Sequence, residues 1–471
     1  MNELTPVYLI AATILAYLAF HVLTRRFDPF APVWLFLVGY VQVYIIQALS
    51  YHDWAVISRG VELTAAANMR ALWALVWFLA VYHLGGGRLV ASVLREPPRA
   101  WSTGAVNVLA PPMAIWGLFC AGVLSRGGQP SPEELSPEEL ILRSFGFLLM
   151  VAAIMLVVTG RAGEKRRTGY LAAGLFTSAL FTAVWMFNGK RSPGIVGVLS
   201  TVCAFYVGKG KRPSWPVLFG TGLSAVLVVT LALGWRNNAR KYESSFGGFL
   251  QFATELDTAS MLENLNIGDG DDPLEYVTQE STEYGGFILM MSTVPEKSDY
   301  DYGANYLRVF STFIPRIIWA DKPLFGRDAW RAAWVHGSEI VREEDFTSPA
   351  IGILGATQLN GGAIGTLAVL AALAMLQRTA YEYFRRHADV PWVQFWWSMT
   401  YYVAWFMVVN DDPMVWFYYS WGFTTLPVVV LVWLVNRFAG STARASAPAP
   451  APAAAAVTAA GMRLGLGGAA R

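Results

Sequence analysis

The amino-acid sequence is dominated by a succession of apolar runs that are long enough to cross a lipid bilayer. A hydrocarbon core about 30 Å thick is crossed by an α-helix of about 20 apolar residues. Only 14% of the 471 residues are charged, whereas about 25% are charged in soluble domains. Because a backbone inside lipid must satisfy its own hydrogen bonds, runs of this kind have to be helices. The sequence therefore predicts an all-α polytopic membrane protein.

About 11 runs are long enough to be transmembrane helices. In chain order we expect spans at residues 6–24, 29–50, 71–93, 105–124, 141–160, 168–187, 193–208, 216–235, 348–376, 392–409 and 414–435. The seventh run is short, and three consecutive glycines interrupt the third. The first run begins near Met1 without a basic segment or a small-residue cleavage site, so we expect it to be retained as a helix.

The positive charges of the loops predict how these spans are oriented. Cytoplasmic loops are enriched in Lys and Arg. Such residues follow the first, third, fifth, seventh, ninth and eleventh runs, whereas the loop after the fourth run is acidic at residues 129–139. This alternation places the N-terminus outside and the C-terminus in the cytoplasm.

The spacing of the runs divides the chain into four parts. Eight spans within residues 1–235 come first, a large extracytoplasmic loop domain follows at 236–347, three spans lie within 348–438, and an Ala-, Pro- and Gly-rich tail fills 439–471. Inside the loop, the apolar stretches 285–294 and 306–319 are too short to cross a membrane. We expect them to form interfacial or re-entrant helices, and we expect the tail to be a disordered cytoplasmic segment.

Positively charged residues on the outer side run against the orientation rule. Lys190 and Arg191 lie in a tight break between the sixth and seventh runs. A charge near membrane depth costs about 2.5–3.5 kcal/mol on insertion scales, and either an anionic ligand or a turn that reaches interfacial water would offset this cost. Further Lys and Arg residues recur near the membrane ends of the outer loop, and this repetition favours binding of an anionic ligand over ion pairs within the loop. The predicted pyrophosphate-binding residues are Lys190, Arg191, Arg236, Arg240, Arg316 and Lys322.

Several loop residues are candidates for proton transfer or for sugar binding. His336 is the only histidine of the loop and could take a proton from a sugar hydroxyl near neutral pH. Glu339 and Glu283 are carboxylate candidates for the same catalytic role. Flat apolar rings suit the C–H faces of sugars, although anchoring at the membrane interface is the simpler function of such residues. The candidate sugar-binding rings are Trp319, Trp330 and Trp334.

Composition and motifs exclude other classes of function. A net charge of +2 gives no electrostatic basis for nucleic-acid binding. The two cysteines, Cys120 and Cys203, lie inside apolar runs, so they predict neither a disulfide framework nor a metal site. The sequence has no nucleotide-phosphate loop, no zinc-spaced His/Glu pair and no GxSxG motif, which argues against an ATP-driven pump and a soluble-type hydrolase. We predict no cofactor and no metal.

Short motifs in the second half of the chain resemble a known family. In order they are Asn188-Gly-Lys-Arg-Ser with Gly194, Tyr302-Gly-Ala-Asn-Tyr, Phe313-Ile-Pro-Arg-Ile-Ile-Trp, Asp321-Lys-Pro, and Ser348-Pro with Gly352, Asn360-Gly-Gly and Gly365. This series resembles the oligosaccharide repeat-unit polymerases, the Wzy-type O-antigen polymerases. The likeness runs from about the sixth span to the ninth, and elsewhere it is limited to hydropathy and loop placement.

This resemblance implies a GT-C-like helical fold in the bacterial inner membrane. It further implies transfer of glycan between undecaprenyl-pyrophosphate-linked oligosaccharide repeats on the periplasmic face, with membrane lipid and a chain-length regulator protein as further expected partners. The implied pyrophosphate-facing cations are Arg191, Arg316 and Lys322, with Arg236 matching by placement alone. Related ligases carry a loop histidine shortly before a Gly-rich helix, whereas this chain has Ser348 there, so an acidic residue is an alternative base.

Our hypothesis from the sequence is a metal-independent, inverting polysaccharide polymerase. An O-antigen ligase is the nearest alternative, because the sequence does not encode the identity of the acceptor. A flippase or transporter for the same lipid is a second alternative. Transporters of this kind show internal repeats and charges near the middle of the membrane, whereas the notable charges here lie toward one face.

Overall fold

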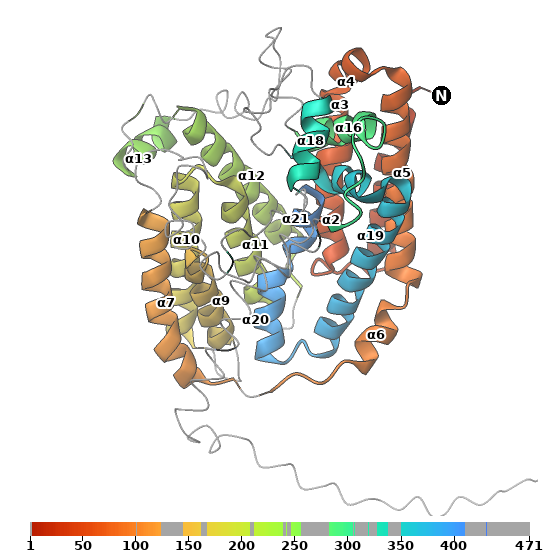
Figure 1. The fold of residues 1–471 in the computed structure, drawn as a ribbon. Coiled ribbons are helices and arrows are strands. Elements are labelled where there is room, and N and C mark those ends of the chain that lie inside the picture. Colours follow the sequence, from red (N-terminus) through yellow and green to blue (C-terminus); the bar gives the residue numbers. More distant parts are fainter. Residues whose placement is uncertain are drawn as a thin grey trace, which may run out of the picture.

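The computed structural model describes residues 2–99, 101–123, 145–161, 167–207, 212–238, 242, 246–255, 282–304, 306, 319, 327–337, 350–409 and 430. Over these residues the regular elements are helices, which confirms the predicted helical class. Figure 1 shows most of the helices standing side by side, with shorter helices gathered at one end.

Seven of the described helices are long and apolar enough to cross a membrane. They cover Thr5–Leu23, Pro32–Ser50, Val61–Val93, Thr103–Gly122, Thr168–Phe187, Trp215–Ala232 and Gly352–Arg386. Two shorter apolar helices, Leu148–Arg161 and Arg191–Val207, coincide with the fifth and seventh predicted runs. The described residues therefore have the character of a helical polytopic membrane protein, and the larger count of about 11 spans stays a prediction.

Two predicted runs differ from the helices in the structure. The run predicted at 71–93 begins earlier, because α5 covers Val61–Leu84 and the short helix α6 covers Gly87–Val93. Polar residues in the first turns of α5 lower the local hydropathy, so the apolar pattern alone predicts a later start. A helical backbone nevertheless accommodates these residues readily. The run predicted at 392–409 consists of α20, Pro391–Thr400, and α21, Val403–Val409. Apart from Val430, the run predicted at 414–435 and the predicted tail lie outside the described residues.

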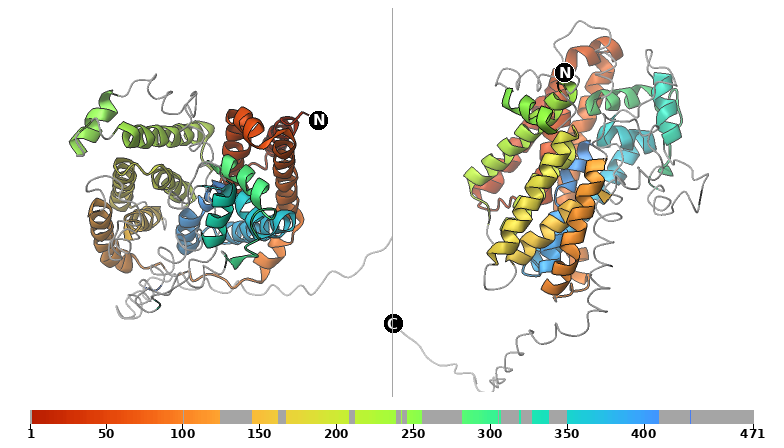
Figure 2. Two further views of the ribbon diagram at one scale, coloured as in Figure 1. Left: turned by 45° about the horizontal axis from the view of Figure 1, so that its top comes forward. Right: turned by 90° about the vertical axis from the view of Figure 1, so that its left-hand side faces the viewer.

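The helices form two groups on either side of α20 and α21 (Figures 1 and 2). One group contains α7, Thr103–Val123; α9, Leu148–Arg161; α10, Thr168–Phe187; α11, Arg191–Val207; and α12, Trp215–Asn238. The other group contains α1, Thr5–Leu23; α2, Pro32–Val41; η1, Gln42–Gln47; α3, Ala48–Ser50; α5; and α19, Gly352–Arg386. Because α20 contacts α9 and α11 while α21 contacts α2 and α19, these two short helices join the groups.

The two ends of the bundle differ in charge and in covering. At the lower end in Figure 1 the connections between helices are rich in arginine, and we call this the basic end. Its described arginines include Arg25, Arg26, Arg88, Arg95, Arg212, Arg385 and Arg386. At the upper end lie four short helices, and we call this the capped end. They are α4, His52–Arg59; α13, Phe246–Glu255; α16, Glu283–Thr293; and α18, Arg327–Gly337.

Helix α16 is the short apolar helix expected near residues 285–294. Nearly all of its residues are buried, and it packs against α5, α18 and α19. The Thr282 side chain caps its first turn by accepting a hydrogen bond from the Gly285 amide at 3.1 Å. This helix is therefore an integral part of the packed core at the capped end.

Helix α19 is broken near its first third, and the segment after α16 fills the break. Gly361 and Gly362 have non-helical backbone angles, with φ at +60° for Gly362. A Cβ on Gly362 would come within 2.8 Å of the Tyr300 hydroxyl oxygen, so only glycine fits there. Close by, the Gly303 amide donates a hydrogen bond to Asn360 Oδ1 at 2.8 Å. The break is thus supported by protein contacts, as an interrupted helix within a membrane requires.

Glycine allows a close approach between α9 and α10. A Cβ on Gly174 of α10 would lie 2.7 Å from the Val157 backbone nitrogen and 2.9 Å from the Ala153 carbonyl oxygen. Small residues of this kind let helix backbones pack tightly where lipid supplies no hydrophobic driving force. The α9–α10 contact therefore depends on the absence of a side chain at position 174.

We expect the substitution Gly174→Ala to destabilise the protein by about 1–3 kcal/mol, because the new methyl group meets backbone atoms that cannot rotate away. Thermal melting of the purified protein measures the effect. Gly169→Ala is the matched control, since nothing lies within 4 Å of a Cβ at that position of the same helix. Equal melting temperatures for the two variants would show that the α9–α10 packing is looser than described.

Candidate functional site

Glu283 is a buried carboxylate at the capped end, and it is one of the predicted catalytic residues. It is the first residue of α16 and is 8% exposed. Negative charge is favoured in the first turn of a helix, where unpaired backbone N–H groups point toward it. Burial of a carboxylate nevertheless requires hydrogen-bond donors.

The principal donor to Glu283 is the side chain of Gln47. Gln47 Nε2 donates to Glu283 Oε2 at 2.6 Å, while Gln47 Oε1 accepts a hydrogen bond from the Tyr284 amide at 3.0 Å. The amide of Gln47 therefore holds both the side chain and the backbone at the start of α16. Gln47 ends η1, a π-helical turn, and such turns occur frequently at functional sites.

Two further residues complete what we call the Glu283 cluster, which consists of Tyr44, Gln47, Glu283 and Gly352. The Tyr44 hydroxyl accepts a hydrogen bond from the Leu354 amide at 3.2 Å. Gly352 has a φ of +58°, and a Cβ there would lie 3.3 Å from the Cβ of Glu283 and 3.5 Å from the Tyr44 hydroxyl. The first turns of α16 and α19 thus meet the π-helical turn at this one point.

A second chain of hydrogen bonds fixes α16 against α5 and the N-terminal segment. The Tyr284 hydroxyl donates to Asn68 Oδ1 at 2.8 Å, and Asn68 Nδ2 donates to the Glu3 carbonyl oxygen at 3.0 Å. Burial raises the pKa of Tyr284 well above its ordinary value, so its hydroxyl remains a neutral donor. The start of α16 is consequently held by Gln47 through Glu283 and by Asn68 through Tyr284.

Arg70 is a half-buried cation in the same group of helices, and sequence analysis did not select it. It lies within α5 and donates a hydrogen bond to Gln358 Oε1, while Gln358 Nε2 donates to the Val294 carbonyl oxygen at 2.5 Å. Among the described residues, no carboxylate lies within ion-pair distance of Arg70. In the sequence, Arg70 is the single arginine among the largely apolar residues 61–84. The predicted span began at residue 71 and therefore left Arg70 out.

Lys190 and Arg191 lie between α10 and α11, at the capped end. Gly189 has a φ of +65°, and the Lys190 amide donates to the Trp185 carbonyl oxygen at 3.0 Å, which ends α10 sharply. Arg191 opens α11 and is exposed. Trp235 Nε1 donates to the Phe187 carbonyl oxygen at 2.8 Å, and this bond brings the last turns of α12 to the same place.

The other predicted cations are tested only in part. Arg236 follows Trp235 in α12, so its backbone lies near the α10–α11 connection, but its side chain is outside the described part of the structure. Arg240, Arg316 and Lys322 also lie outside the described residues. The predicted cation cluster is therefore placed only at Lys190, Arg191 and the Arg236 backbone.

The predicted acid–base and sugar-binding residues are spread over several environments. His336 is exposed on α18, and Glu339 lies outside the described residues. Trp334 is 2% exposed and packs in a core with Leu289 of α16 and Leu359 of α19. Its predicted contact with sugar stays a prediction, as does that of Trp319, which is 38% exposed. The side chain of Trp330 on α18 lies outside the described atoms.

Neither a metal-binding cluster among the described residues nor a similar protein indicates which reaction this protein could catalyse. Within the described ranges, no three His, Cys, Asp or Glu side chains lie close enough to share a metal ion. Comparison of the chain with protein-family models, characterised proteins and solved structures found no significant match. The resemblance to repeat-unit polymerases therefore stays a prediction, and the Glu283 cluster is the best-defined candidate site.

We expect the hydrogen bond between Gln47 and Glu283 to couple the two residues by about 1–3 kcal/mol, because removing Gln47 alone leaves a buried carboxylate without its donor. A double-mutant cycle of Gln47→Leu, Glu283→Leu and the double variant, followed by thermal melting, measures this coupling.

The exposed pair of Gln251 and Glu255 on α13 is the matched control for this cycle. Its amide and carboxylate are 2.9 Å apart, and both residues face solvent. The same cycle there should give a coupling of at most about 0.5 kcal/mol. A coupling at Gln47 and Glu283 as small as this would mean that the carboxylate is not held as described.

Proposed function

We propose that this protein is a membrane glycosyltransferase that polymerises lipid-pyrophosphate-linked oligosaccharide repeat units at its capped end. The observation that carries the proposal is the buried carboxylate of Glu283. Among the described residues its side chain is held by the neutral amide of Gln47, and no described cation lies within ion-pair distance. A carboxylate held in this way can accept a proton from a hydroxyl group.

A structural role alone gives little reason to retain such a carboxylate. Burying it is costly unless it is well hydrogen-bonded, and an apolar or amide side chain would pack α16 with less penalty. Glu283 also lies on a short helix at one end of the bundle, at the level where a lipid-linked headgroup is expected.

The proposed reaction is a single displacement at the anomeric carbon of the donor. The acceptor hydroxyl oxygen forms a bond to that carbon while its proton passes to Glu283. The bond from the same carbon to the pyrophosphate oxygen breaks, and the lipid pyrophosphate leaves with the bonding electrons. Configuration at the anomeric carbon is thereby inverted.

Lys190 and Arg191 supply the positive charge that the leaving group requires. Both lie at the capped end, in the connection that also meets the end of α12. Charged donors placed where negative charge develops stabilise a transition state, and arginine binds phosphate oxygens with two parallel hydrogen bonds. In this proposal the cations stabilise the leaving group and Glu283 accepts the proton of the acceptor.

The distribution of arginine supports an orientation with the basic end in the cytoplasm and the capped end in the periplasm. Asp53 on α4 and Asp389 between α19 and α20 are exposed residues at opposite ends. In intact cells we expect an impermeant maleimide to label an Asp53→Cys variant, and to label Asp389→Cys only after the membrane is permeabilised. The native Cys120 and Cys203 are buried and give a low background. Labelling in the reverse order would contradict the orientation.

We expect Glu283→Gln to lower chain extension by about 100-fold or more, because the amide cannot take the proton of the acceptor. The assay uses the purified protein in lipid vesicles with a pyrophosphate-linked repeat as the only substrate, and gel electrophoresis resolves the products. The amide retains the shape of the side chain, so the melting temperature should remain close to that of the wild type.

Arg191→Gln should also reduce extension, whereas Lys297→Gln is the matched control because Lys297 is an exposed cation of the same end. Extension that is unaffected by Glu283→Gln would contradict the assigned role of Glu283. A wild-type protein that transfers the glycan only when a lipid A core acceptor is added would be a ligase. One that moves the lipid between leaflets without extension would be a transporter.

A further inference from the structure

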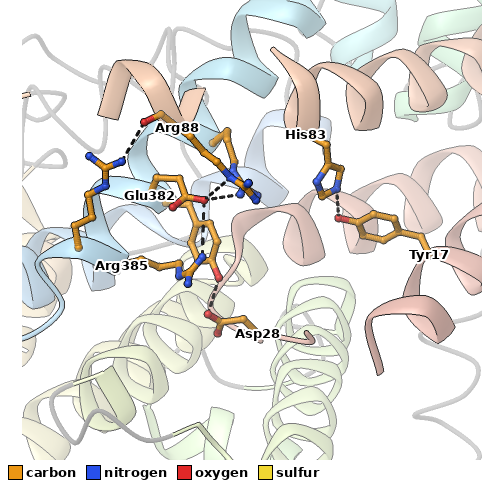
Figure 3. A network of polar contacts seen from close by, with 9 residues as sticks. Tyr17, Asp28, His83, Arg88, Glu382 and Arg385 are labelled. Carbon is orange, nitrogen blue, oxygen red and sulfur yellow. Dashed lines mark hydrogen bonds and ion pairs between the residues drawn. The ribbon is translucent and has the colours of Figure 1, made fainter. Parts of the chain in front are cut away.

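A network of charged side chains lies at the basic end, far along α19 from the Glu283 cluster. Glu382 accepts contacts from three guanidinium groups, and Figure 3 shows Arg88 and Arg385 approaching it from different sides. Arg88 Nε is 3.2 Å and Arg385 Nη1 is 3.8 Å from Glu382 Oε1. The third partner, Arg378, lies one helical turn before Glu382 and bonds to the same oxygen. We call these four residues the Glu382 network.

Positive charge exceeds negative charge in the Glu382 network. One carboxylate faces three guanidinium groups. Two other carboxylates lie near the last turns of α19. The carboxylate of Asp28 accepts a hydrogen bond from the Tyr381 hydroxyl at 2.6 Å, and that of Glu96 lies near Tyr383. Neither makes a described ion pair with an arginine. At least one guanidinium charge is therefore left without a counterion among the described residues.

The inner part of the network is buried and fixed. The Arg378 side chain is 7% exposed, its guanidinium carbon lies 5.2 Å from the centre of the Tyr82 ring, and its Nε has no hydrogen-bond acceptor among the described atoms. A Cβ on Gly87 would come within 2.8 Å of the Arg378 Cβ, so α6 lies directly on this residue. A buried donor without an acceptor is rare in proteins.

The outer part of the network offers free hydrogen-bond donors at the surface. The side chains of Arg88 and Arg385 are 66% and 53% exposed. Arg88 uses only its Nε toward Glu382, so neither of its terminal nitrogens has a described partner. Arg386 Nη2 donates to the Arg88 carbonyl oxygen at 3.2 Å, which holds α6 in place beside α19. Two forked donor groups are thus presented next to each other on a rigid support.

We propose that the Glu382 network binds the phosphate of an anionic phospholipid in the leaflet at the basic end. Guanidinium forks match the oxygens of a phosphate, and one phosphate would neutralise the excess charge. The network lies at the end of α19, a candidate membrane span, which is where phospholipid headgroups are found. Ordinary arginines of a cytoplasmic loop would be solvated separately and would not converge from two helices on one carboxylate. This site is independent of the proposed transfer reaction.

The test compares lipid binding by the wild type and by an Arg88→Gln/Arg385→Gln variant, with Arg378 and Glu382 left intact. Native mass spectrometry of the purified protein, titrated with phosphatidylglycerol or phosphatidylcholine, measures the bound lipid. We expect the double variant to bind phosphatidylglycerol about tenfold more weakly, with binding of phosphatidylcholine unchanged. Arg95→Gln is the matched control, because Arg95 is an exposed arginine of the same end that makes no described ion pair. It should bind like the wild type.

Equal affinity of the wild type and the double variant for phosphatidylglycerol would overturn the proposal and leave an ion-pair network only. Equal weakening by Arg95→Gln would also overturn it, because the binding would then follow the charge of the whole end. In a second arm, inorganic phosphate is added to the protein in phosphatidylcholine. If inorganic phosphate raises the melting temperature, phosphatidylglycerol does not, and the double variant abolishes the effect of inorganic phosphate, the ligand is a soluble phosphate and the lipid is excluded. Melting in phosphatidylcholine alone checks that both variants fold.

Discussion

The cost of placing charge among apolar helices governs where this protein keeps its charged side chains. A charge in hydrocarbon costs several kcal/mol unless hydrogen bonds or an opposite charge surround it. The described structure meets this constraint in three ways. Glu283 is held by a side-chain amide, Arg70 donates to a glutamine, and Arg378 pairs with Glu382 in a buried ion pair. The first two arrangements join helices that are distant in sequence, and Arg88 of α6 joins the third, so these contacts also contribute to the packing of the bundle.

Helix α19 extends from the Glu283 cluster at the capped end to the Glu382 network at the basic end. Its first turn lies against Glu283, the break at Gly361 and Gly362 follows, and its last turns carry Glu382. At the capped end a carboxylate lacks a described cation, whereas at the basic end guanidinium groups outnumber the carboxylate. A proton acceptor suits the first environment and an anion suits the second. The two sites that we propose therefore lie at opposite ends of one helix, and a change at one end need not alter the other.

The sequence predicted the helical class, most of the described membrane spans and the short helix near residues 285–294, because all of these depend on the local pattern of apolar residues. Glu283 was a predicted catalytic candidate, and that role stays a prediction; its burial was not foreseen. Gln47 was not predicted, because it is 236 positions away from Glu283 and only the fold brings the two together. Arg70 was missed because a hydropathy boundary ignores polar residues that a helix accommodates. The burial of Trp334 also depends on tertiary packing, which a single sequence does not contain.

In the proposed reaction the carboxylate of Glu283 faces the reacting groups of a lipid-pyrophosphate-linked sugar. The most direct measurement is a structure of the protein bound to a non-hydrolysable phosphonate analogue of such a donor together with an acceptor repeat. We predict that the diphosphate lies at the capped end against Arg191 and that an acceptor hydroxyl is within hydrogen-bond distance of Glu283. An analogue bound at the basic end, or a Glu283 carboxylate still sealed between α16 and α19 with no ligand atom near it, would contradict this role of Glu283.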